Sequence, residues 1–217
     1  MNRQLLPIFM ATASLANAAT VAWTANGTVS SATGVYSADG IVADTPVGIE
    51  MKYDDQAGHT ITKELPFFSV EEIDYWNSID LSISITIGDQ TWKGNVHTAP
   101  DDNGFRTLFL KLDGKEGASE SITATIQDDD GGSFEFFPLE VEAENSLIQL
   151  LFSSTDNNFL SNSVAENSLD ENLITSATGF LQSGSSNKIT FDLDPASIAI
   201  ENEVLPPNSG YRPTPDQ

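Results

Sequence analysis

The chain has 217 residues, no cysteine and two histidines, and 9 basic against 32 acidic side chains give a formal charge of −23. Disulfide frameworks and thiolate-ligated metal sites are excluded because both need cysteine. Nucleic acid is not expected as a partner, since that affinity comes mainly from Lys and Arg side chains that neutralise phosphates. The same negative charge disfavours anionic membrane surfaces.

The first eighteen residues have the pattern of a secretory signal peptide. Arg3 is the only charge before the apolar run of residues 5–11, and Ala16-Asn17-Ala18 has the form of a cleavage site. The run is too short to span a bilayer, which takes about 20 residues, and no membrane span is predicted later in the chain. A buried N-terminal strand is the alternative. We expect cleavage near Ala18 and export to the extracellular space or the periplasm.

The clearest predicted strand covers residues 81–87, in which Leu or Ile alternates with Ser or Thr. Gly88-Asp89 predicts a turn into a return strand at residues 90–94, and thus a hairpin. Residues 122–126 alternate in the same way, and residues 133–136 predict a second hairpin with an acidic tip. Further strands are predicted at residues 21–30, 47–53, 105–112, 147–153, 188–193 and 197–201.

Helix signals are few. Ser69-Val70-Glu71-Glu72 has the form of a capping box and predicts one short helical turn, and residues 163–174 are compatible with another helix. The many short strands predict an all-β fold, an antiparallel β-sandwich or jelly roll, as a single domain over residues 19–204. Residues 205–217 contain four prolines and are predicted to be a disordered tail.

Two stretches carry a family resemblance. A strand, a turn and the entry to a second strand are predicted by Asn26-Gly27-Thr28-Val29-Ser30-Ser31 and Asp44-Thr45-Pro46-Val47-Gly48-Ile49, with an end at Tyr53-Asp54. This opening, with the closing strand at residues 189–193, resembles secreted bacterial proteins of the PEP-CTERM type. The resemblance implies an exported β-sandwich associated with exopolysaccharide or the cell exterior and no known catalytic residues.

The chain departs from that family at its end. Glu203-Val204-Leu205-Pro206-Pro207 stands where the family has Val-Pro-Glu-Pro, and Arg212 is the one arginine where the family has a cluster after an apolar helix. Sorting to the cell surface by that route is therefore not expected.

Enzyme signatures are weak. The Gly-x-Ser-x-Gly pattern is absent, and His59 and His97 lack metal-site spacing. A Ser–His–Asp triad would need one of these histidines beside a serine and a carboxylate. A pair of carboxylates for glycoside hydrolysis stays open, because 32 acids are present. We expect no enzymatic activity, with a secreted polysaccharide-active enzyme as the third interpretation.

The acidic charge is concentrated between Lys115 and Lys188, where 13 acids and no Lys, Arg or His occur. Asp128, Asp129 and Asp130 at the predicted hairpin tip are the calcium candidates, since Ca²⁺ takes six to eight oxygen ligands. A hydrated turn is the alternative. The tripeptide does not begin an EF-hand loop, because Leu139 stands at the twelfth position. Asp101-Asp102-Asn103 is a second, weaker candidate.

Sugar binding is predicted most strongly at Tyr75 and Trp76, which lie in an irregular segment before a strand, where binding residues often occur. Trp23 and Trp92 are weaker candidates, because large aromatic residues in a sandwich more often belong to the core.

Taken together, the sequence features favour a structural or adhesive protein of the cell surface or extracellular matrix. Its expected partners are extracellular polysaccharide or cell-surface components, and a carbohydrate-binding module, with or without a requirement for Ca²⁺, is the alternative.

Overall fold

The computed structural model describes residues 19–54, 59–64, 68–74, 77–97, 106–114, 119–127, 135–137, 146–156, 159–160 and 169–204. These residues form thirteen strands, and every pairing is antiparallel, which confirms an all-β fold. The strands are β1 (Ala19–Ala32), β2 (Pro46–Asp54), β3 (His59–Glu64), β4 (Phe68–Asp74), β5 (Asn77–Ile87), β6 (Gln90–His97), β7 (Arg106–Gly114), β8 (Glu120–Gln127), β9 (Glu135–Phe137), β10 (Ser146–Ser154), β11 (Ser176–Ser183), β12 (Asn187–Leu193) and β13 (Ala199–Val204). The short helices are α1 (Val35–Ala38), η1 (Glu171–Leu173) and η2 (Pro195–Ser197).

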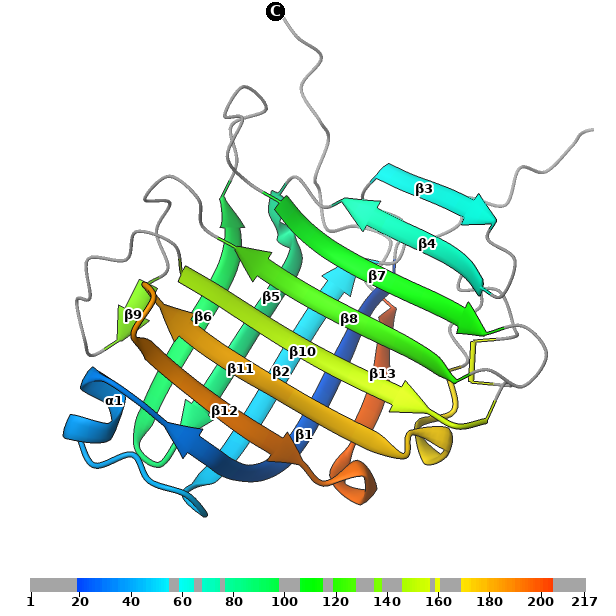
Figure 1. The fold of residues 1–217 in the computed structure, drawn as a ribbon. Helices are drawn as coiled ribbons and strands as arrows, with labels where there is room; N and C mark the ends of the chain where they lie inside the picture. The colour runs from blue at the N-terminus through cyan, green and yellow to red at the C-terminus, as the bar shows by residue number, and fades with distance from the viewer. Residues whose placement is uncertain are drawn as a thin grey trace, which may run out of the picture.

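The strands form one continuous sheet that curls over on itself. Along the sheet the order is β3-β4-β7-β8-β10-β11-β12-β1-β2-β5-β6-β9, and β13 also pairs with β1. In Figure 1, β7, β8, β10, β11 and β12 lie in front of β13, β1, β2, β5 and β6. The two halves thus face each other and enclose one core.

Strand β1 joins the two halves. Residues 19–24 pair with β13, whereas residues 27–32 pair with β12. At the change of partner Gly27 lies so close to the Asp192 backbone that a β-carbon would overlap its carbonyl oxygen. A bulge between Val29 and Ser31 follows, and bulges bend a strand and increase its twist. The glycine of the Asn26-Gly27-Thr28 stretch therefore permits the bend of the sheet.

The core follows from the alternation of apolar and polar residues. Leu81, Ile83, Ile85 and Ile87 of β5 are all buried, while Ser82, Ser84 and Thr86 lie on the outer side. The same period of two holds along β10, β11 and β12. Each half of the sheet therefore presents one apolar face inward and one polar face outward.

Helix α1 closes the end of the interior beside β12 (Figure 1). Tyr36 is buried and meets Trp92 of β6 edge to face, with ring centroids 6.1 Å apart. The helix begins where the Val35 amide donates to the Asn187 side-chain oxygen at 3.1 Å. The first residue of β12 thus fixes the start of the helix that covers the core.

Several predicted elements are confirmed. The hairpin at residues 81–94 forms as β5 and β6, with Gly88 in the left-handed region at φ 57°. The strands predicted at residues 21–30, 47–53, 147–153 and 188–193 form as β1, β2, β10 and β12. Each lies in a stretch with clear alternation or with strand-forming residues.

Two predictions of local structure are wrong. The capping-box segment at residues 69–72 belongs to strand β4, which pairs with β3 and β7 on its two sides. The hairpin of residues 122–136 does not form, because β8 pairs with β7 and β10, and β9 pairs with β6. In both cases pairing with strands outside the local motif supplies the backbone hydrogen bonds.

Strand β11 was not expected from the sequence, and in the range predicted as a possible helix the described part, residues 169–174, contains only the single turn η1. The predicted signal peptide at residues 1–18 and the predicted tail at residues 205–217 lie outside the described residues. No helix in the described ranges is long and apolar enough to cross a membrane.

Candidate functional site

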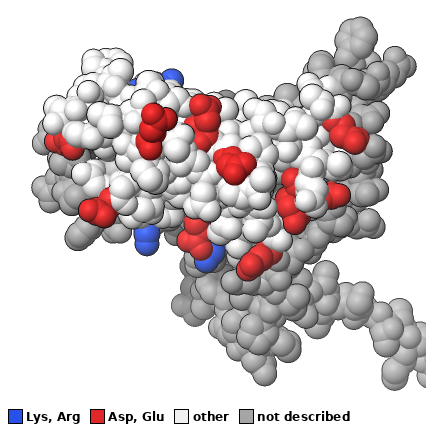
Figure 2. Space-filling view, turned by 90° about the horizontal axis from the view of Figure 1, so that it is seen from below, with Lys and Arg blue, Asp and Glu red and all other residues white. Residues whose placement is uncertain are grey.

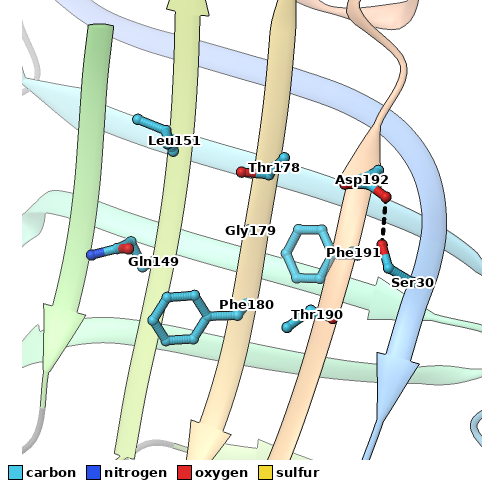
Figure 3. A pocket seen from close by; sticks show the side chains of 9 residues that line it. All are labelled: Ser30, Gln149, Leu151, Thr178, Gly179, Phe180, Thr190, Phe191 and Asp192. Carbon is cyan, nitrogen blue, oxygen red and sulfur yellow. Dashed lines mark hydrogen bonds between the residues drawn. The ribbon is translucent and has the colours of Figure 1, made fainter.

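The candidate site lies on the outer face of the front half of the sheet, where three neighbouring strands place six side chains in two rows. Leu151, Thr178 and Asp192 pair across β10, β11 and β12 in one row. The second row, two residues along each strand, contains Gln149, Phe180 and Thr190. Because alternate residues of a strand share a face, all six side chains point away from the core (Figure 3).

A depression of about 300 Å³ lies over these two rows. This volume is at the lower end of the range of small-ligand sites. Ser30 of β1 closes the depression on one side, and Gly179 and Phe191 contribute at its centre (Figure 3). The lining therefore combines an aromatic ring, an aliphatic side chain, hydroxyl groups, an amide and a carboxylate.

The polar groups are tied to one another across strands. The Ser30 hydroxyl donates to the Asp192 carboxylate at 2.5 Å, and the Ser31 and Thr190 hydroxyls are 2.7 Å apart. On the other side the Gln149 amide donates to the Thr125 hydroxyl at 3.3 Å. These contacts restrain the side chains of Asp192, Thr190 and Gln149, and restrained side chains lose less entropy when a ligand binds.

Phe180 is the aromatic side chain on this outer face, and it is half-buried. The Lys188 ammonium lies 4.1 Å from its ring centroid, a cation–π contact. Leu151, 37% exposed, lies diagonally across from Phe180 in the adjacent row. Apolar and polar groups therefore alternate over the depression, with Leu151 and Phe180 on one diagonal and Gln149 and Thr178 on the other.

A second depression, of about 250 Å³, lies on the outer face of the other half of the sheet. It lies over β1, β2 and β5, where Gly48 stands between Asn26 and Thr86 and leaves a gap in the row of side chains. Beside it Lys52 and Glu50 form an exposed ion pair at 2.9 Å. This second depression has no aromatic side chain in its lining.

The acidic residues of the described surface do not gather into a metal site. Seen from below, most acidic side chains are separated from one another by uncharged surface (Figure 2). Within the described ranges no three Asp, Glu or His side chains are placed to hold a metal ion. The surface charge of this part is thus spread out and hydrated.

Tyr36 is a titratable group in the described part of the chain whose pKa departs clearly from its value in water. Burial raises its pKa from 10.0 to about 12, and the polar Ser183 hydroxyl nearby offsets a smaller part of this rise. The ring lies inside the core against Trp92, so the hydroxyl is inaccessible to a substrate. Its role is structural.

The residues singled out from the sequence have different outcomes. Tyr75, Trp76, Asp128, Asp129 and Asp130 lie outside the described residues, as does the weaker candidate at residues 101–103. Trp23 and Trp92 are fully buried, in agreement with a core position. His59 begins β3 and His97 ends β6.

Sequence reasoning missed the depression because it missed β11. Gly179 interrupts the apolar face of that strand, so Ser176–Ser183 lacks a continuous alternating pattern. A signal was present in Thr178, Phe180 and Gln182, which alternate with Ala177 and Leu181.

No family model matches the chain, and comparisons with curated proteins and with solved structures found no match either.

Proposed function

We propose that the protein is an exported, non-catalytic β-sandwich protein that works by adhesion, holding polysaccharide in the extracellular matrix or at the cell surface. The observation that carries the proposal is the outer face of β8, β10, β11 and β12. Its outward residues are mainly hydroxyl and amide side chains in cross-strand rows: Ser121, Thr123, Thr125, Gln149, Ser153, Ser176, Thr178, Gln182 and Thr190. Such groups both donate and accept hydrogen bonds, as sugar hydroxyls do.

The architecture supports this role. A curled sheet whose halves share one apolar core is the physical basis of a β-sandwich, and we infer a sandwich of jelly-roll-like form. The chain has no cysteine, so this core needs no disulfide outside the cell. The rigid strands hold the outward side chains in fixed rows, which suits repeated contacts with a polymer.

Two sequence features support the location. Residues 1–18 have the pattern of a signal peptide, and the resemblance to PEP-CTERM-type proteins implies an association with exopolysaccharide. Export and cleavage are tested by measuring the mass of the protein recovered from the culture medium. We expect a chain that begins at Ala19, and a full-length chain found only inside the cells would contradict export.

The adhesive role is tested with the secreted protein, labelled and added to washed cells that produce their own matrix. We expect retention that periodate oxidation of the matrix sugars abolishes and that protease treatment of the cells leaves unchanged. No retention, or retention lost to protease alone, contradicts the proposal. Reducing ends released from the matrix would instead support the polysaccharide-active enzyme.

A further inference from the structure

We propose that the depression over β10, β11 and β12 binds a sugar unit of an uncharged polysaccharide. This inference rests on the proposed function and names the site and the ligand class. It is carried by the two rows of side chains described above, which include Leu151 and Phe180 on one diagonal and Gln149 and Thr178 on the other.

The lining of the depression matches the two kinds of surface that a sugar ring presents. A pyranose has apolar C–H groups on its faces and hydroxyl groups around its rim. The exposed surfaces of Leu151 and Phe180 offer apolar contact to the C–H groups. Thr178 offers a hydroxyl and Gln149 an amide, which donate to or accept from the rim.

Charge decides between uncharged and anionic polymers. Asp192 is the one carboxylate in the lining, and it already accepts the Ser30 hydroxyl. Lys188 lies beside the depression, so these two opposite charges balance locally. The chain as a whole carries −23, and this field repels polyanions. An uncharged chain therefore meets the hydrogen-bonding groups without an electrostatic penalty.

Lys188 restrains the Phe180 ring at the edge of the depression. Its ammonium lies 4.1 Å from the Phe180 ring centroid and restrains the ring, and an ammonium carries three N–H donors, more than one ring contact engages. We therefore expect Lys188 to donate to a sugar hydroxyl while it stays on the ring. An aromatic ring restrained in this way loses little entropy when a ligand binds.

The test is affinity electrophoresis of the secreted protein in gels that contain one polymer each. The uncharged probes are dextran, mannan, galactan and hydroxyethylcellulose, and the anionic probes are alginate and hyaluronate. We expect at least one uncharged polymer, and neither anionic polymer, to retard the protein. Retardation by no uncharged polymer overturns the proposal, and so does retardation by the anionic polymers alone.

Variants assign the retardation to the depression. Phe180→Ala removes the ring, and Thr178→Val removes one hydroxyl while keeping the shape of the side chain. We expect each to weaken binding about tenfold, the loss of roughly one hydrogen bond or apolar contact. The matched control is Thr86→Val, which lies over the second depression and should bind like the parent protein. Thermal unfolding of each variant checks that the fold is retained.

The outcomes separate this inference from the proposed function. If an uncharged polymer retards the parent and all three variants equally, the depression is not the site, while the adhesive function stands. If Thr86→Val alone loses binding, the site lies on the other half of the sheet and the inference is wrong. If the parent protein is retained on its own matrix but by none of the uncharged polymers, the inference again fails by itself.

Discussion

Trp23 of β1 packs against Phe152 of β10 across the interior, with ring centroids 4.7 Å apart and planes inclined by 52°. The two residues belong to opposite halves of the curled sheet, and both are fully buried. The indole Nε1 of Trp23 has no hydrogen-bond partner within the described ranges, so Trp23 contributes through its apolar surface. This contact therefore ties the two halves together.

Phe152→Ala should lower the free energy of unfolding by about 3–5 kcal/mol, the usual cost of a buried Phe→Ala change. The reason is the cavity left between β1 and β10 opposite Trp23. Urea unfolding followed by tryptophan fluorescence measures the effect. The neighbouring Leu151→Ala is the control, because Leu151 is 37% exposed on the outer face and should cost far less. Equal losses in the two variants would contradict the described packing.

Gly179→Ala should destabilise the protein, because its β-carbon would lie 2.5 Å from the ring of Phe191. The ring occupies the space that a side chain at residue 179 would need, and overpacking of this kind costs about 1–3 kcal/mol. Adding Phe191→Leu to Gly179→Ala should restore part of that loss. If the double variant loses as much stability as the two single variants together, the steric explanation is wrong.

Gly27→Ala should destabilise more severely and without rescue by a side-chain change. The group in its way is the Asp192 backbone, and a shift there would disturb the pairing of β1 with β12. Gly48→Ala is the matched control on the neighbouring strand, where the nearest atom is Asn26 Oδ1 at 3.7 Å. We expect the melting temperature of Gly48→Ala to stay close to that of the parent. A normal melting temperature for Gly27→Ala would show that β1 does not approach β12 this closely.

Tyr36 should make the protein less stable in alkali. Burial raises its pKa from 10.0 to about 12, so the folded state holds the phenolic proton more tightly than the unfolded state does. The associated stability is fully present below pH 10 and is lost as the pH rises toward 12. The free energy of unfolding, measured with urea at several pH values over this range, should fall less steeply for Tyr36→Phe than for the parent protein. Parallel pH profiles for parent and variant would mean that Tyr36 ionises normally.

Calcium binding at the acidic tripeptide stays a prediction from the sequence. Millimolar calcium should raise the melting temperature, because bound Ca²⁺ would relieve the repulsion among Asp128, Asp129 and Asp130. Asp128→Asn combined with Asp130→Asn should abolish the rise. Asp39→Asn combined with Asp44→Asn is the control, since these two exposed residues lie elsewhere. No shift in the parent protein removes the calcium hypothesis.

Much of the strand content could be predicted from the sequence. Residues 81–87 alternate strictly, and the structure buries the expected side of that strand. The turn at Gly88-Asp89 could also be predicted from adjacent residues, because glycine readily takes the positive φ that a two-residue hairpin loop requires. Such features depend on residues that are close in the chain, so they can be recognised without knowing the fold.

The partners of the strands could not be predicted in the same way. Residues 122–126 were correctly predicted as a strand, yet their neighbours are β7 and β10 rather than the segment at residues 133–136. Residues 69–72 contain a helix-start motif but form the middle of a paired strand. Pairing depends on which distant apolar faces can be buried together, and a local motif carries little information about that.

The sequence by itself determined that the chain forms strands with one apolar and one polar face, because side-chain direction alternates along any strand. Only the tertiary structure decided that β10, β11 and β12 lie side by side. It thereby placed Gln149, Thr178 and Phe180 on one surface, although more than 25 residues of chain separate the first from the other two. Register between strands is set by burial of the shared core, so the outward face could be known only after the inward face had been packed.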